Sequence, residues 1–209
     1  MPGTTSSERT LGVILFPGFE LLDVFGPLEA FGNLPGLFKV LMVAETRGPV
    51  PSGQGPQAVA DVDFHDCPRL DVILVPGGIG TREQVDNPRF LDWLARRAMH
   101  AELVTSVCTG SALLARAGML EGRRATTNKA FFQWVSEQGR NVEWIREARW
   151  VEDGKFVTSA GVSAGIDMAL AVIARKVGRD VADNVTRAME YTWRSDPGDD
   201  PFARLWGLV

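Results

Sequence analysis

The sequence predicts a single-domain α/β protein built on a mostly parallel β-sheet with helices on both faces. Short, continuous apolar runs at residues 11–16 and 71–75 are typical of strands that are buried on both faces. Both runs end at a Pro-Gly pair, and segments with helical spacing alternate with the apolar runs along the chain. The length of 209 residues lies within the range of one such domain.

The opening of the chain follows a β-α-β order. The apolar run at 11–16 predicts the first strand. The segments 20–25 and 27–31 have helical spacing, and Pro27 is tolerable in the first turn of a helix. A second strand is predicted at 37–43. Residues 47–58 contain three prolines and three glycines, so we expect a loop there.

The remaining elements continue the alternation. Strands are predicted at 59–64, 71–75, 101–107 and 123–127, with a hairpin at 149–157 that turns at Asp153-Gly154. Helices are predicted at 88–97, 109–120, 130–135, 164–177 and 181–191. The sequence contains no internal repeat or domain linker.

We expect one domain over residues 10–209, preceded by a disordered tail at 1–9. Residues 194–209 begin as an acidic loop but end with Phe202, Leu205 and Trp206. Because exposed groups of this size are costly, we expect this segment to dock on the body of the protein or on a second subunit. A homodimer is therefore the expected assembly.

Composition excludes several classes of protein. The 26 acidic and 22 basic side chains give a net charge of −4 and form no concentrated basic face, so nucleic acid is not an expected partner. No apolar run reaches the roughly 20 residues that cross a bilayer, and the polar N-terminus does not resemble a signal peptide, so we expect a cytoplasmic protein without a membrane partner. The two cysteines show no metal-ligand spacing, so we expect no metal site.

Cys108 is the candidate nucleophile. It follows the predicted strand at 101–107 and precedes a predicted helix, and Thr109 and Gly110 allow a tight turn there. Ligands of open α/β sheets bind beyond the carboxyl ends of the strands, and a helix N-terminus stabilises a thiolate. We therefore predict a reactive cysteine with a lowered pKa on a nucleophile elbow. The alternative is a buried, inert cysteine, which is our interpretation of Cys67.

Two further segments complete the candidate site. The turn that contains Gly77, Gly78 and Ile79 ends a neighbouring strand, where backbone amides are suited to an oxyanion hole. Asp23 follows the first strand on an apolar face and is the candidate proton carrier, although helix capping explains it equally well. The two histidines, His65 and His100, lie at no predicted strand end.

Five motifs in order resemble those of one family. They are Leu15-Phe-Pro-Gly-Phe-Glu-Leu-Leu-Asp-Val-Phe-Gly-Pro27, Val75-Pro-Gly-Gly78, Ser106-Val-Cys-Thr-Gly-Ser111, Arg124-Ala-Thr-Thr127 and Gly161-Val-Ser-Ala-Gly-Ile-Asp-Met-Ala-Leu170. The chain resembles the ThiJ/PfpI family of the class I glutamine amidotransferase-like superfamily, and within it the isonitrile hydratases. The resemblance implies a flavodoxin-like three-layer sandwich.

The resemblance also implies an activity. It is the addition of water to an isonitrile, a small-molecule substrate, to give an N-substituted formamide without a cofactor. Cys108 would form a thioimidate, Asp23 would act as general acid and base, Thr109 would orient groups beside the sulfur, and Gly78 would supply a backbone amide.

Two departures from the family pattern bear on this expectation. Proteolytic members carry a histidine directly after the nucleophile, where this chain has Thr109, which argues against peptide hydrolysis. Hydratases commonly carry a histidine where this chain has Asn128. A glutathione-independent glyoxalase that acts through Cys108 and a non-enzymatic oxidation or metabolite sensor remain the alternatives.

Overall fold

A computed structural model describes residues 8–209 and contains a seven-stranded sheet in the order β10-β11-β7-β6-β1-β2-β5. Its strands are β1 (Arg9–Ile14), β2 (Phe38–Ala44), β5 (Val62–Asp63), β6 (Val72–Val75), β7 (Leu103–Ser106), β10 (Trp150–Asp153) and β11 (Phe156–Ser159). Every neighbouring pair is parallel except β10 and β11, which form the predicted hairpin. The prediction of a mostly parallel sheet is confirmed.

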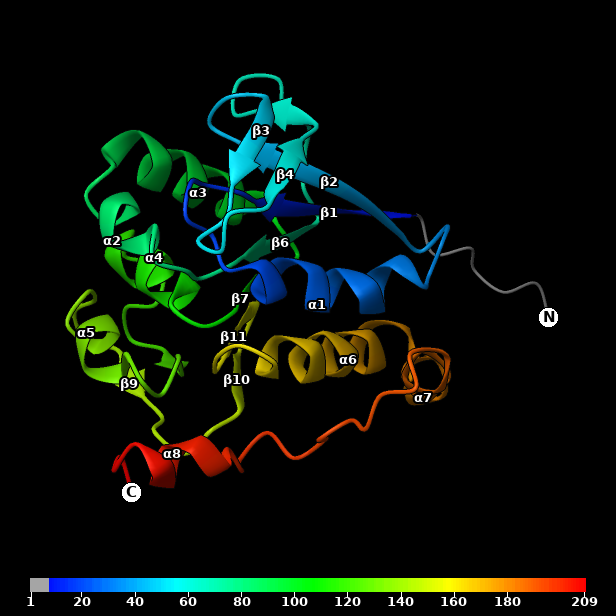
Figure 1. Cartoon of the computed structure of the whole chain (residues 1–209), viewed down its shortest axis with the longest axis vertical. Coiled ribbons are helices and arrows are strands. Elements are labelled where there is room, and N and C mark those ends of the chain that lie inside the picture. The colour runs from blue at the N-terminus through cyan, green and yellow to red at the C-terminus, as the bar shows by residue number, and fades with distance from the viewer. Residues whose placement is uncertain (1–7) are drawn as a thin grey trace.

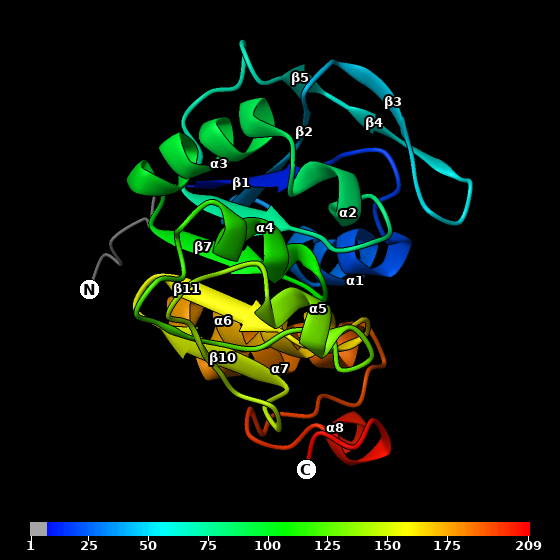
Figure 2. The same ribbon diagram turned by 90° about the vertical axis from the view of Figure 1, so that its left-hand side faces the viewer.

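Helices cover both faces of the sheet, which confirms the three-layer sandwich (Figures 1 and 2). One face carries α1 (Leu21–Gly32) and α6 (Ala164–Val177), with α7 (Arg179–Ala188) packed against α6. The other face carries α2 (Thr81–Gln84), α3 (Pro88–His100), α4 (Gly110–Arg116) and α5 (Phe132–Ser136).

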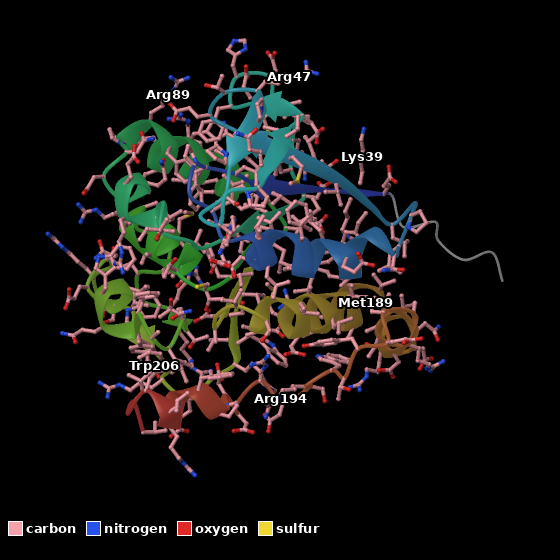
Figure 3. All side chains as sticks on the ribbon, in the orientation of Figure 1. Lys39, Arg47, Arg89, Met189, Arg194 and Trp206 are labelled. Atoms are coloured by element: carbon pink, nitrogen blue, oxygen red, sulfur yellow. The ribbon has the colours of Figure 1, made fainter. Side chains whose placement is uncertain are left out.

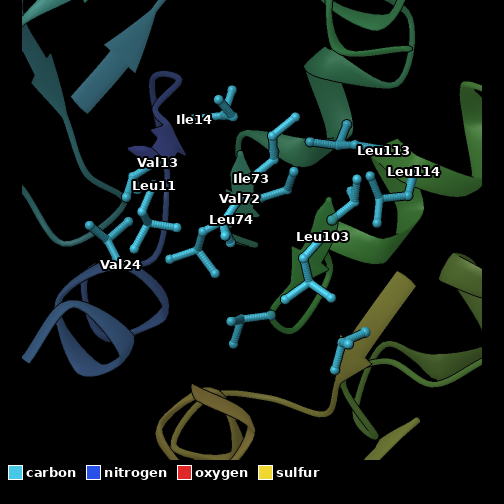
Figure 4. Close-up of a cluster of buried hydrophobic side chains, with 14 of the residues drawn as sticks. Leu11, Val13, Ile14, Val24, Val72, Ile73, Leu74, Leu103, Leu113 and Leu114 are labelled. Atoms are coloured by element: carbon cyan, nitrogen blue, oxygen red, sulfur yellow. The ribbon is translucent and has the colours of Figure 1, made fainter. Parts of the chain in front are cut away.

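The core follows from the apolar runs in the sequence. All four residues of β6 and all four of β7 are buried, because helices pack on both of their faces. Figure 4 shows the strand side chains of Leu74 and Leu103 in one cluster with Val24 of α1 and Leu113 of α4. This rigid centre fixes the carboxyl ends of β1, β6 and β7, where the candidate site lies.

One predicted loop and one predicted strand differ in the structure. Residues 47–58, predicted to be a loop, include β3 (Gly48–Pro51), which pairs antiparallel with β4 (Gln57–Ala60). The prolines are tolerated because this two-stranded sheet has only edge strands. The strand predicted at 123–127 is reduced to β8 (Arg124–Ala125), which pairs with β9 (Glu143–Trp144), a strand that sequence reasoning missed.

Helix boundaries also differ from the predictions. Pro27 lies in the middle of α1 instead of in a first turn, because the segments at 20–25 and 27–31 form one continuous helix. The helix predicted at 109–120 ends at Arg116, and the chain turns at Gly118, whose φ is +75°. Glycine adopts this left-handed conformation at little steric cost.

The C-terminal segment lies against the body of the protein. It contains α8 (Pro201–Leu205), and the Arg149 amide donates to the Pro197 carbonyl at 2.8 Å. Of the tail predicted at 1–9, residues 1–7 lie outside the described residues, and Arg9 already belongs to β1. Within residues 8–209, no helix is both long and apolar enough to cross a membrane.

Candidate functional site

Cys108 lies on a strained turn between β7 and α4. Its φ of +56° is one of three positive values at non-glycine residues in the described chain. Side chains strongly disfavour this region, so such strain persists only where the surroundings enforce it. The Cys108 amide donates to the Ala160 carbonyl at 3.2 Å, and its carbonyl accepts from Thr127 Oγ1 at 2.9 Å. The predicted strand-to-helix elbow is present.

Asp23 is fully buried on α1 and lies beside this cysteine. Its Oδ2 accepts a hydrogen bond from the Gly77 amide at 2.8 Å, whereas no described residue bonds to its Oδ1. Burial raises the pKa of Asp23 well above its usual value, against the lowering effect of the Gly77 amide and of the contact with the Cys108 thiol. Neighbouring Glu20 raises the pKa further. The carboxyl group therefore favours its protonated form.

The prediction that Cys108 has a lowered pKa is wrong. Burial, followed by the charge of Asp23, raises the pKa of the thiol well above its usual value. The Thr109 amide and the Asn128 side chain lower it, but they do not outweigh the loss of hydration. The prediction took account of the helix N-terminus but not of the burial of the thiol. The helix itself is short, since α4 has only seven residues.

The two glycine amides of the predicted oxyanion hole are already engaged. Gly77 donates to Asp23, and the Gly78 amide donates to Thr109 Oγ1 at 3.1 Å. Thr81 Oγ1 also lies 3.2 Å from Thr109 Oγ1. In this structure the turn therefore positions the acid and the threonine instead of offering free donors. Ile79, which follows the two glycines, is 68% exposed.

Asn128, the residue that departs from the family pattern, contacts the sulfur directly. Its Nδ2 donates to Cys108 Sγ at 3.1 Å, while its Oδ1 accepts from the Phe131 amide at 3.1 Å, which fixes the orientation of the side-chain amide. Gly161 completes this side of the site: a Cβ there would collide with Asn128 Nδ2 and lie 3.0 Å from Sγ. Sequence reasoning did not place Gly161 here, although it stands at the end of a strand, just beyond β11.

A hollow of about 280 Å³ opens beside Asn128 and Gly161. Asn128, whose Nδ2 donates to Cys108 Sγ, lines one side of it together with Gly161. The rest of its wall combines residues of α1, the segment before α5, the start of α6 and the C-terminal segment: Leu22, Lys129, Ala130, Val162, Ser163, Phe202 and Trp206. The site therefore shares Asn128 with a space that has room for a small molecule.

The other candidate residues lie elsewhere. Cys67 is buried and its thiol donates to the Pro68 carbonyl at 3.4 Å. His65 and His100 are exposed, as expected for residues without a role at the cysteine. His65 lies within 4.8 Å of the carboxylates of Asp63 and Asp66, but exposed acidic groups of this kind are common without a metal ion.

The fold and this site define a class, namely flavodoxin-like α/β proteins that carry a cysteine on a strained turn between a parallel strand and a helix. The chain belongs to the DJ-1/PfpI family, whose model matches residues 9–175. The family membership expected from the five motifs is thus confirmed.

Relatives within the family have different activities. The chain is 40% identical to the isonitrile hydratase of Pseudomonas putida over 181 residues, which are 87% of this chain and 78% of that protein. It is 26% identical over 196 residues to a helix-turn-helix transcriptional regulator of Pseudomonas aeruginosa. That match covers 91% of this chain but only 53% of the regulator, so the chain spans about half of the regulator's length.

Solved structures support the fold. A ThiJ/PfpI family protein from Pseudomonas syringae has a TM-score of 0.82 and 32% identity, covering 95% of this chain and 79% of that chain. A DJ-1 superfamily protein from Salmonella typhimurium has a TM-score of 0.76 and 25% identity, covering 88% of this chain and all of that one.

Proposed function

We propose that this protein is a cysteine-dependent hydratase that converts isonitriles to N-substituted formamides, without a cofactor. The observation that carries the proposal is the buried Asp23 carboxyl group next to the strained Cys108 thiol. The 40% identity to an isonitrile hydratase directs this pair towards isonitrile chemistry.

The first step uses both groups in their protonated forms. The sulfur of Cys108 bonds to the isonitrile carbon while Asp23 gives its proton to the same carbon and receives the thiol proton. The product is a thioimidate, R–N=CH–S–Cys108. The raised pKa of Asp23 suits this exchange, because it favours the protonated form from which an acid donates.

The second step adds water to the thioimidate carbon. Asp23, which now carries the thiol proton, gives that proton to the nitrogen and accepts one from the water, which gives R–NH–CH(OH)–S–Cys108. The carbon–sulfur bond then breaks, the hydroxyl proton returns to sulfur, and R–NH–CHO leaves. Oδ1 of Asp23, which no described residue occupies, is the atom available for these transfers. Thr109 and Asn128 hold the turn and the sulfur in place.

The raised pKa of Cys108 also disfavours the sensor alternative. Oxidation sensors depend on an exposed thiolate, whereas this thiol is buried and protonated at neutral pH. The glyoxalase alternative gains no specific support from the site.

The experiment is incubation of the protein with methyl, cyclohexyl and benzyl isonitrile in water labelled with ¹⁸O, followed by mass spectrometry. We expect the corresponding formamide with one ¹⁸O atom, and no product from Cys108→Ala. Cys67→Ala is the matched control and retains turnover, since Cys67 lies outside the site. Absence of formamide from every isonitrile would overturn the proposal, and lactate formed from methylglyoxal would then identify the glyoxalase alternative.

A further inference from the structure

Two aromatic side chains of the C-terminal segment face the hollow beside Cys108. Phe202 and Trp206 both line it, together with Leu22 and Val162. They stand four residues apart, so they lie on the same side of α8. Phe202 is 44% exposed and Trp206 is 56% exposed. Figure 3 shows Trp206 on α8, at the end of the molecule opposite β3 and β4.

A buried anchor holds α8 in this place. Asp200 caps the helix by accepting from the Phe202 amide at 3.1 Å, and its own amide donates to the Glu147 carbonyl at 2.9 Å. Its carboxylate faces the buried Arg149 across 3.8 Å, and Arg149 pairs with Asp167 of α6 at 2.6 Å. The two aromatic rings therefore project from a fixed helix.

The wall of the hollow has the character of an apolar binding site. Lys129 is its one lining residue with a charged side chain, and that ammonium group donates to Thr126 Oγ1 at 2.9 Å and to the Ala148 carbonyl. A cavity of about 150 Å³ accommodates benzene. The hollow of about 280 Å³ thus has room for a six-membered ring.

We propose that Phe202 and Trp206 bind the non-reacting substituent of the substrate, so that α8 makes the protein selective for isonitriles with an aryl or cycloalkyl group. This inference rests on the proposed function for the identity of the reacting group. The size and apolar wall of the hollow, and the Asn128 side chain that links this wall to Cys108 Sγ, support it independently.

The first test compares Trp206→Ala with Leu205→Ala. Leu205 is 72% exposed on the same helix and does not line the hollow, which makes it a matched control. We expect Trp206→Ala to lower the ratio of kcat/KM for benzyl over methyl isonitrile about tenfold, because only the benzyl group contacts the indole. Phe202→Ala should lower the same ratio, and Leu205→Ala should leave it unchanged.

The second test does not depend on hydration. Peptide mass spectrometry follows the alkylation of Cys108 by N-benzyl iodoacetamide and by iodoacetamide. Trp206→Ala should lower the ratio of the rate with N-benzyl iodoacetamide to the rate with iodoacetamide. Leu205→Ala should leave this ratio unchanged. If this ratio shifts but no isonitrile is hydrated, the proposed function fails and the apolar binding site stands. Unchanged ratios in both tests overturn the inference. Light scattering tests the alternative occupant of the hollow, which is a second subunit. If Trp206→Ala abolishes a dimer and leaves both ratios unchanged, the indole belongs to a subunit interface.

Discussion

Asn128 donates a hydrogen bond from Nδ2 to Cys108 Sγ across 3.1 Å. A side-chain amide does not titrate, so this contact holds the sulfur without exchanging a proton with it. The proton chemistry of the site therefore depends on Asp23, which lies on the first helix of the chain. This division between a positioning amide and a titrating acid underlies the first three predictions.

Replacement of Asp23 by Asn should lower the pKa of the Cys108 thiol. The ionised form of the Asp23 carboxyl group raises this pKa, and the variant has no group that ionises at this place. The pH dependence of the iodoacetamide reaction rate measures the change. Turnover of isonitriles should fall by about 10²-fold or more, because the variant has no general acid. An unchanged thiol pKa would contradict the placement of the carboxyl group next to the sulfur.

The same Asp23→Asn variant should be more stable than the parent protein at neutral pH. Burial raises the pKa of Asp23 above its unfolded value, so the folded state binds more protons between those two pKa values. Stability of the parent protein therefore falls as the pH rises from about 4 through the raised pKa, whereas the Asn side chain does not titrate. Thermal unfolding of both proteins between pH 3.5 and 8 should give curves that converge at the acidic end. A difference in thermal stability that grows towards low pH would contradict the prediction.

Replacement of Asn128 by Ala should raise the pKa of Cys108, since the amide hydrogen bond lowers it. At pH 8 the rate of alkylation should fall about two- to tenfold, which corresponds to one hydrogen bond of about 0.5–1.5 kcal/mol. Asn33→Ala removes an exposed side-chain amide at the end of α1 and serves as the control. Equal rates for both variants would show that the amide does not stabilise the thiolate.

Removal of the Arg149 guanidinium should strongly destabilise the fold. Arg149 and Asp167 are both buried, so Arg149→Leu leaves a carboxylate without its main partner, at a cost of about 3–5 kcal/mol. Arg175 pairs with Glu152 on the surface, and Arg175→Leu should cost less than about 1 kcal/mol. Urea denaturation gives both free energies of unfolding. Similar losses in the free energy of unfolding for the two variants would show that the buried pair of Arg149 and Asp167 is no more important for stability than the surface pair.

Alanine at Gly78 should disrupt the turn beside the site. The φ of Gly78 is +125°, and a Cβ would collide with the backbone of Gly18 and lie 2.5 Å from the Glu20 amide. Neither backbone atom is free to move far, so we expect a loss of about 3 kcal/mol or more. Gly118 also has a positive φ, but it borders open space, and Gly118→Ala should cost about 1–2 kcal/mol. The order of the two melting temperatures tests this difference.

Much of the fold was predictable because each buried strand carries its own signal. The apolar runs that became β1, β6 and β7 are each followed by turn residues. Pairings between short segments were not predictable. β3 contains two prolines and β9 has only two residues, and each of these strands exists because another segment pairs with it.

The sequence by itself determined the layered α/β architecture, the turn that presents Cys108 and the family to which the chain belongs. Only the tertiary structure decided the protonation of that cysteine, the contact with Asn128 and the position of Trp206 at the hollow that Asn128 lines. Hydrophobic periodicity is a local property that can be read along the chain. A pKa or a pocket instead depends on which remote groups share one poorly hydrated space, and the distances among Asp23, Cys108 and Trp206 exist only after folding.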